Sequence, residues 1–439
     1  MIQPRDNMLQ QKTIVIVTDA GVTTDTYRPA MNGVVRTWDT VSKILAERGY
    51  KLTIITPQQF HTKPFPPYPK IQLAKPFHPK KGEKTVWRTL RDTKPDYIHN
   101  ATPEGPLGFL TWVYCARNRE KFSMSYHTRM PEYAEEYVRD IAERLTRRVP
   151  FSSTIEKLAA RLVGEEGRRV IPEYADYYVR GLAERLTGRV PFSSTIKNLT
   201  SRIAREGAHM FLSQIYSQAE SVLVPTKTLQ GELKARNYRK TTIWPRGVDT
   251  QLFSPDYPML PEVAKLKPPI FLYVGRVAKE KNIGVFLDAK LPGTKVVVGG
   301  GPELDYFISK YADRANIVFV GEKLDEELSR FYASCAQMRA VFAFPSLTDT
   351  YGNTILEAWA SGLIVAAFNV PSPIDVIIDP KTGVLTADIT PEGFANALMA
   401  ARQLDGGYAR DYVKQNLTWD KVVDILEKHF VPTIRTRSR

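Results

Sequence analysis

Short runs of apolar, β-branched residues alternate along the chain with longer stretches whose apolar residues recur at helical spacing. The first run is residues 13–18 (TIVIVT), helical spacing follows over residues 34–48, and another strand is predicted at residues 51–56. Strand, helix and strand in this order are typical of a parallel sheet covered by helices. The first part of the chain is therefore predicted to be an α/β domain.

The same alternation begins again after a proline-rich interval at residues 254–269. It predicts further strands at residues 270–274, 294–298, 316–320 and 340–344. Two α/β domains of the Rossmann type, joined by a linker, are the simplest interpretation. The predicted units are residues 1–245, residues 246–418, and a C-terminal amphipathic helix with a polar tail over residues 419–439.

A near-repeat interrupts the first domain. The segment PEYAEEYVRDIAERLTRRVPFSSTI at residues 131–155 returns at residues 172–196 as PEYADYYVRGLAERLTGRVPFSSTI. Each copy predicts a helix, a break at Val-Pro-Phe and a second helix, so a duplicated helical insertion is expected over residues 131–211. Two interpretations stay open: the copies pack on each other, or they form an arm that contacts a membrane or another subunit.

The excess of positive charge lies in the first half of the chain. The whole sequence of 439 residues has 61 Lys+Arg against 47 Asp+Glu, and residues 1–245 have 39 against 24. Residues 75–94 contain seven Lys/Arg and two acids, with Phe77 and Trp87 between them. Such a segment suits an anionic membrane surface, with nucleic acid or another polyanion as the alternative partner.

Composition excludes several classes of protein. A hydrophobic content of 43% is too high for general disorder. Cys115 and Cys335 are far apart in the sequence, which excludes a disulfide scaffold and a Cys-rich zinc site. No apolar stretch has the length of a signal peptide or a membrane span, so we expect a cytosolic protein or one bound to the cytosolic face of a membrane.

Loops next to predicted strands carry candidate ligand-binding residues. Arg276 and Lys281 lie in GRVAKEKN, directly after a strand, where two cations suit a diphosphate. Gly300 of GGGP, after the next strand, would let the backbone approach a ring or phosphate. Gly33, before a helix of the first domain, is a further candidate for close approach to an anion. A solvated loop or a simple turn would explain each of these segments as well.

The segment PSLTDTYGNTILEAWASG, after the strand at 340–344, combines a loop and a helix. Asp349 lies in the loop, and Glu357 is expected about two turns into the helix. Backbone N–H groups of Thr350, Tyr351 and Gly352 can donate to phosphate oxygens, and a carboxylate further along can accept from sugar hydroxyls. Because the segment is otherwise apolar, a purely structural Glu357 would be half buried without a partner.

In this order and at these separations, the motifs resemble those of the retaining glycosyltransferases of family 4. The resemblance covers nearly the whole chain outside the duplicated segment. It is best with the branch of mannosyl- and glucosyltransferases that includes enzymes with lipid acceptors. It implies the GT-B architecture, in which two Rossmann-like domains face a cleft. The matching segments are TDTYRPAMNGVVRTW, SYHTRMPEY, WPRGVD, FLYVGRVAKEKN, KVVVGGGP and PSLTDTYGNTILEAWASG.

The resemblance implies roles for the positions that match. Arg276 and Lys281 would neutralise the departing diphosphate of the donor, Glu357 would hold its ribose hydroxyls, and Asp349 would hold the transferred sugar. In the first domain, Gly33 would approach the phosphates and His127 would assist at the reacting centre. Asp19 or Asp25 could occupy the loop before Gly33, and Ser372 stands where the branch usually has glycine.

The implied reaction retains the anomeric configuration and requires no metal and no cofactor. The donor would be a GDP- or UDP-sugar, the transferred group mannose or glucose, and the acceptor a lipid or glycolipid at the cytosolic membrane face. Two alternatives stay open, a transferase acting on nucleic acid or another soluble polyanion and a sugar-nucleotide binding protein without turnover. Donor base, sugar, acceptor and oligomeric state are not determined by the sequence.

Overall fold

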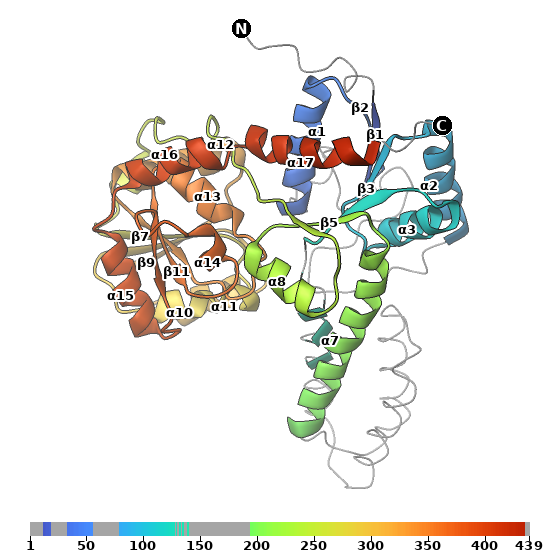
Figure 1. The fold of residues 1–439 in the computed structure, drawn as a ribbon. Coiled ribbons are helices and arrows are strands. Elements are labelled where there is room, and N and C mark those ends of the chain that lie inside the picture. Colours follow the sequence, from blue (N-terminus) through green and yellow to red (C-terminus); the bar gives the residue numbers. More distant parts are fainter. Residues whose placement is uncertain are drawn as a thin grey trace.

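The computed structural model contains two parallel six-stranded sheets, each in its own α/β half, and this confirms the expected fold class (Figure 1). It describes residues 12–18, 33–55, 79–127 and 194–434, together with some of residues 129–139. Asp19, Asp25, Phe77 and most of the duplicated segment therefore lie outside the described residues.

The N-terminal sheet has the strand order β2-β1-β3-β4-β5-β6, with every neighbouring pair parallel. Its central strands are buried along their whole length, as expected where helices cover both faces. The strands are β1 (Thr13–Val17), β2 (Lys51–Ile55), β3 (Tyr97–Asn100), β4 (Phe122–Ser125), β5 (Ser221–Val224) and β6 (Thr241–Ile243). The helices are α1 (Gly33–Glu47), α2 (Pro79–Thr93), α3 (Pro106–Asn118), α7 (Ser194–Ser217) and α8 (Lys227–Ala235).

The C-terminal sheet has the order β12-β11-β10-β7-β8-β9, also parallel throughout. The expected strands at 270–274 and 294–298 are found with those limits, the strand expected at 316–320 is shifted by one residue to 317–321, and the strand expected at 340–344 begins one residue later. The strands are β7 (Ile270–Val274), β8 (Thr294–Val298), β9 (Ile317–Gly321), β10 (Val341–Phe344), β11 (Ile364–Phe368) and β12 (Gly383–Thr386). The helices are α9 (Pro261–Ala264), η3 (Lys279–Lys281), α10 (Ile283–Asp288), α11 (Leu304–Lys310), α12 (Asp325–Gln337), α13 (Asn353–Ala360), α14 (Pro373–Val376), α15 (Pro391–Ala401) and α16 (Gly406–Asn416).

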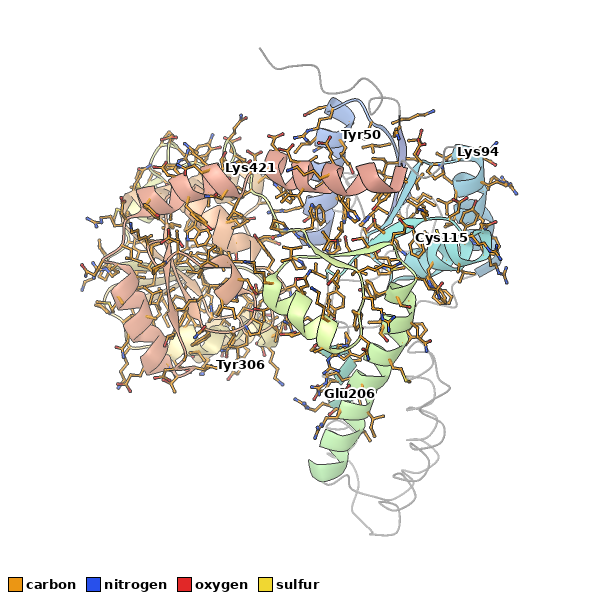
Figure 2. The ribbon with its side chains drawn as sticks, viewed as in Figure 1. Tyr50, Lys94, Cys115, Glu206, Tyr306 and Lys421 are labelled. Carbon is orange, nitrogen blue, oxygen red and sulfur yellow. The ribbon has the colours of Figure 1, made fainter. Side chains whose placement is uncertain are left out.

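Helix α7 joins the end of the second repeat copy to the core of the N-terminal half. Its first half extends away from the sheet (Figure 1). Glu206 lies near the middle of the helix (Figure 2) and forms an ion pair with Arg236 at 2.7 Å. Its last turns bury Leu212, Ile215 and Tyr216 in the core. The expected end of the insertion at residue 211 therefore falls inside one continuous helix.

The last helix, α17 (Trp419–Ile434), returns to the N-terminal half and lies across α1 (Figure 1). Val422, Val423 and Leu426 belong to the same buried cluster as residues of β1 and α1. Arg48, directly after α1, lies at the outer side of this contact and forms ion pairs of 2.7–3.0 Å with three acids of α17, Asp420, Asp424 and Glu427.

The chain thus crosses between the two halves twice, after β6 and before α17. At the crossings Val248 pairs with Thr418 in an isolated parallel bridge. Gly247 packs directly on Trp419, because a Cβ on Gly247 would lie 2.7 Å from the Trp419 backbone. The two crossing segments support each other at this point.

The basic segment at residues 75–94 forms α2 over most of its length. Trp87 is half buried and donates from its indole nitrogen to the Leu110 carbonyl of α3 at 3.1 Å, so it serves helix packing. Arg88, Arg91 and Lys94 are exposed, and Lys94 lies at the outer edge of the molecule (Figure 2). Within the described parts of the chain, no helix has the length and apolarity needed to cross a membrane.

Candidate active site

The candidate residues lie on loops that leave the carboxyl ends of strands, the usual position of ligands in open parallel sheets. His127 follows β4 and Arg246 follows β6 in the N-terminal half. Arg276 follows β7 and Asp349 follows β10 in the C-terminal half. Contacts between the two halves bring these loops together.

Lys281 and Asp349 form an ion pair, with Nζ 2.5 Å from Oδ1. Burial acts to raise the pKa of Asp349, but neighbouring groups, with the charge and hydrogen bond of Lys281 first among them, together outweigh it, so the pKa lies below its ordinary value. The positive charge of Arg276 acts in the same direction, while its guanidinium contacts Glu280. The sequence-predicted cations and carboxylate are therefore brought together, and Asp349 is ionised at neutral pH.

The glycine-rich loop packs against the loop that carries Arg276. A Cβ on Gly299 would lie 2.0 Å from the Gly275 carbonyl oxygen, and one on Gly301 would lie 2.3 Å from that of Val277. Contact between the two loops therefore explains these two glycines. At Gly300 a Cβ would meet no protein atom closer than 4.0 Å, so this is the position that leaves room for a ligand.

The loop after β10 also contacts the N-terminal half. Thr350 donates from Oγ1 to the His127 carbonyl oxygen at 3.0 Å. Tyr351 is buried beside Arg246, and burial raises the pKa of its hydroxyl to about 12. Gly352 precedes α13 with φ +83°, a left-handed conformation that favours glycine. This loop thus joins the Asp349 site to His127.

Glu357 lies in the second turn of α13, closer to the start of the helix than expected, and its residue is 7% exposed. The sequence predicted that a purely structural Glu357 would lack a partner, but the Glu357 carboxylate has two partners within the protein. Arg36 Nη1 of α1 lies 3.3 Å from Oε1, and the Tyr332 hydroxyl lies 3.5 Å from Oε2. Burial raises the pKa of Glu357 despite the opposing effects of Arg36 and Tyr332. Arg36 lies within a motif that the sequence singles out, but its role depends on a partner 321 positions away.

His127 is enclosed by two donors. Trp38 Nε1 lies 3.0 Å from Nε2, and Arg246 Nη2 lies 2.6 Å from Nδ1. Burial, the charge of Arg246 and nearby His99 hold the pKa of His127 well below its ordinary value. The imidazole is therefore neutral at physiological pH.

Arg246 is a site residue that sequence reasoning missed, although it lies in the quoted segment WPRGVD. Its residue is 5% exposed, its guanidinium carbon lies 5.0 Å from the centre of the Trp244 ring, and Nη1 donates to the Trp244 carbonyl at 3.1 Å. Burial lowers its pKa to about 10, so it stays charged at neutral pH. Its burial depends on tertiary structure, and the motif alone does not reveal it.

Gly33 is the first residue of α1, the helix that carries Arg36 and Trp38 to the domain interface. Among the described residues, no group of three or more His, Cys, Asp or Glu side chains could hold a metal ion.

Two family matches cover most of the chain. Residues 261–416 match the family described as Glycosyl transferases group 1, and residues 31–171 match Glycosyltransferase Family 4. The chain belongs to glycosyltransferase family 4. The resemblance noted from the sequence motifs is thereby confirmed.

Relatives of this family 4 protein agree with the assignment. A GDP-mannose-dependent alpha-mannosyltransferase of Mycolicibacterium smegmatis is 30% identical over 247 residues, which span 54% of this chain and 63% of the relative. Sucrose-phosphate synthase from Thermosynechococcus elongatus has a TM-score of 0.63 at 17% identity, covering 97% of this chain and 99% of that one. An Anabaena protein, Alr3699/HepE, solved with UDP and glucose, has a TM-score of 0.57 at 14% identity and covers 96% and 99%. The structural likeness confirms the GT-B fold.

Proposed function

We propose that this family 4 protein is a retaining, metal-independent hexosyltransferase that uses a GDP- or UDP-sugar. The observation that carries the proposal is the meeting of the Lys281–Asp349 pair with His127 through the contact made by Thr350. The name of the Mycolicibacterium relative supports GDP-mannose as donor, and the UDP and glucose of the Anabaena structure make UDP-glucose the second donor to test.

In the proposed reaction the bond between the anomeric carbon and the phosphate oxygen breaks. The acceptor hydroxyl oxygen bonds to that carbon on the same face, and its proton passes to the departing phosphate oxygen. Arg276 and Lys281 would offset the charge that develops on the diphosphate, which is the main electrostatic requirement of this step. Asp349 would accept hydrogen bonds from the sugar hydroxyls and Glu357 from the ribose, since ionised carboxylates are acceptors only.

The proposed acceptor is a lipid or glycolipid at the cytosolic face of a membrane. Support comes from the charge of residues 1–245 and from three exposed cations, Arg88 and Arg91 of α2 and Lys94 directly after it. Each cation near an anionic membrane surface contributes about 1 kcal/mol to binding. Because Trp87 packs against α3, the described part of this surface would contact a membrane through charged side chains and not through this aromatic ring.

The decisive experiment measures release of the nucleoside diphosphate by the purified full chain. GDP-mannose and UDP-glucose are supplied separately, in EDTA, with and without a membrane lipid extract. We expect release from one donor, stimulated by the extract, and a product with the anomeric configuration of the donor by NMR. Binding without any release would identify a protein without turnover, and stimulation by RNA in place of lipid would support the polyanion alternative.

A further inference from the structure

Arg246 differs from the other cations at the domain interface in its electrostatic surroundings. Within the described parts of the chain, no ion pair joins its guanidinium to a carboxylate; its side-chain partners are the Trp244 carbonyl, the Trp244 ring and His127. An unpaired cation with 5% exposure is costly, because burial removes its hydration. The other cations there are each matched with an acid: Arg36 with Glu357, Arg276 with Glu280, and Lys281 with Asp349.

The contact with His127 does not neutralise the charge of Arg246. In addition, the two donors that face the His127 imidazole cannot both find an acceptor there. Arginine and tryptophan side chains are donors only, and a neutral imidazole has one nitrogen that accepts and one that carries hydrogen. Trp38 and Arg246 nevertheless face both nitrogens of His127, at 3.0 and 2.6 Å. One of the two contacts must therefore set a donor against a donor, so a stronger acceptor would readily replace His127 as the partner of Arg246.

We propose that Arg246 binds an anionic group of the acceptor substrate, of the phosphate, sulfate or carboxylate class, and exchanges its contact with His127 for it. The inference rests on the proposed function and specifies its acceptor. A planar guanidinium suits such groups because it donates two parallel hydrogen bonds to one anion. Release of Arg246 also lets Nδ1 of His127 carry its hydrogen without opposing a donor.

The position of Arg246 favours the acceptor over the donor as the source of the anion. Arg246 follows β6 of the N-terminal sheet, whereas Arg276 and Lys281, the cations assigned to the donor diphosphate, follow β7 of the other sheet. The two sources share their chemistry, so the experiment must separate them.

The experiment follows thermal stabilisation of the full chain by inorganic phosphate while GDP or UDP is present at saturation. The nucleotide fills the donor position, and sodium chloride at matched ionic strength corrects for general screening. We expect phosphate to stabilise the wild-type protein further. In Arg246→Gln the apparent Kd for phosphate should rise about tenfold or more, because a charge-assisted hydrogen bond is lost. Binding of the nucleotide should be unchanged.

Two further variants keep the test informative. Arg246→Lys retains the charge without the planar fork, so a smaller rise in the phosphate Kd is expected, and this comparison stands even if the Gln variant does not fold. Arg410→Gln is the control, because the Arg410 side chain is also largely buried but is paired with Asp256 and bonds to the carbonyls of Phe253 and Ala360, away from His127.

The outcomes are distinct. An unchanged phosphate Kd in both Arg246 variants, or an equal rise in the Arg410 control, would overturn the proposal. If phosphate no longer stabilises the wild-type protein once nucleotide is bound, Arg246 is assigned to the donor diphosphate and the acceptor assignment is overturned. Failure of both nucleotides to stabilise the chain would count against the proposed function, and the phosphate titration of wild type and variants would still decide the role of Arg246.

Discussion

At the scale of single residues, the sequence located the side chains whose context is local. Arg276, Lys281 and Asp349 follow apolar strands within a few positions, and parallel sheets bring such loops to one edge. Arg36 and Arg246 could not be assigned in this way. Their significance depends on burial and on partners in the tertiary structure, Glu357 in the other half of the molecule and His127 across the N-terminal sheet.

Removal of the Lys281 amine should impair the departure of the diphosphate. In Lys281→Ala we expect a loss in kcat of about 100-fold or more, comparable to loss of one preorganised donor at a reacting centre. Lys279→Ala is the matched control, since Lys279 is exposed in the same short helix. Equal rates for the two variants in the nucleotide-release assay would contradict the role of Lys281.

The Arg36–Glu357 pair should show coupling in a double-mutant cycle. Arg36→Ala leaves a buried carboxylate without its cation, which should cost about 1–3 kcal/mol of unfolding free energy. The pKa of Glu357 should rise further, so the deficit should grow as pH rises and the group is forced to ionise. Adding Glu357→Gln should recover much of the loss in urea unfolding at neutral pH; strictly additive effects would argue against the pair.

At the scale of elements, short apolar runs predicted six of the twelve described strands, β1, β2 and β7–β10, because buried parallel strands are short and almost entirely apolar. The path of α7 was not predictable. Its beginning belongs to the repeat and its end to the core, and no change in helical spacing marks the difference. The packing of α17 on α1 was missed for a similar reason, since an apolar face does not identify the surface that it covers.

Helix α2 and Lys94 directly after it should provide much of the affinity for anionic vesicles. Neutralising three exposed cations, by Arg88→Gln, Arg91→Gln and Lys94→Gln, should weaken binding by about 1 kcal/mol for each residue. The control replaces three exposed lysines of the C-terminal half, Lys265, Lys267 and Lys290, by Gln. Flotation with phosphatidylserine vesicles compares the two, and similar losses would mean that total charge, not α2, determines binding.

The crossing at Gly247 should tolerate no side chain. In Gly247→Ala the new Cβ would lie 2.7 Å from the Trp419 backbone, and overpacking of this kind costs about 1–3 kcal/mol. Gly231→Ala, within α8 and with no atom inside 4 Å, should be neutral or stabilising by up to about 1 kcal/mol. Thermal unfolding of both variants tests this, and an unaffected Gly247 variant would show that the crossing segments can separate.

At the scale of the whole molecule, stability should fall as pH decreases below about 6.5, the ordinary pKa of histidine. Burial lowers the pKa of His99, His127 and His209, the last to about 4. The unfolded chain therefore binds protons in this range that the folded chain does not, so each buried histidine removes up to about 1.4 kcal/mol per pH unit.

Urea unfolding over mildly acidic pH measures this slope. Glu132 and Glu357 act in the opposite sense, because burial raises their pKa above the ordinary value and the folded chain therefore binds their protons more readily than the unfolded chain. Replacement of His127 by Gln should reduce the slope by about one proton's contribution. A slope that is flat from neutrality to mild acidity would contradict the burial of these histidines.

The return of α17 to the N-terminal half affects the order in which the protein can fold during synthesis. Domains usually fold as they leave the ribosome, the N-terminal one first. Here the cluster around Trp38 and Trp244 lacks Val422, Val423 and Leu426 until the last helix has been translated. The half that is made first is therefore completed last. Nascent chains stalled before α17 should expose to chaperones the apolar face of α1 on which α17 packs.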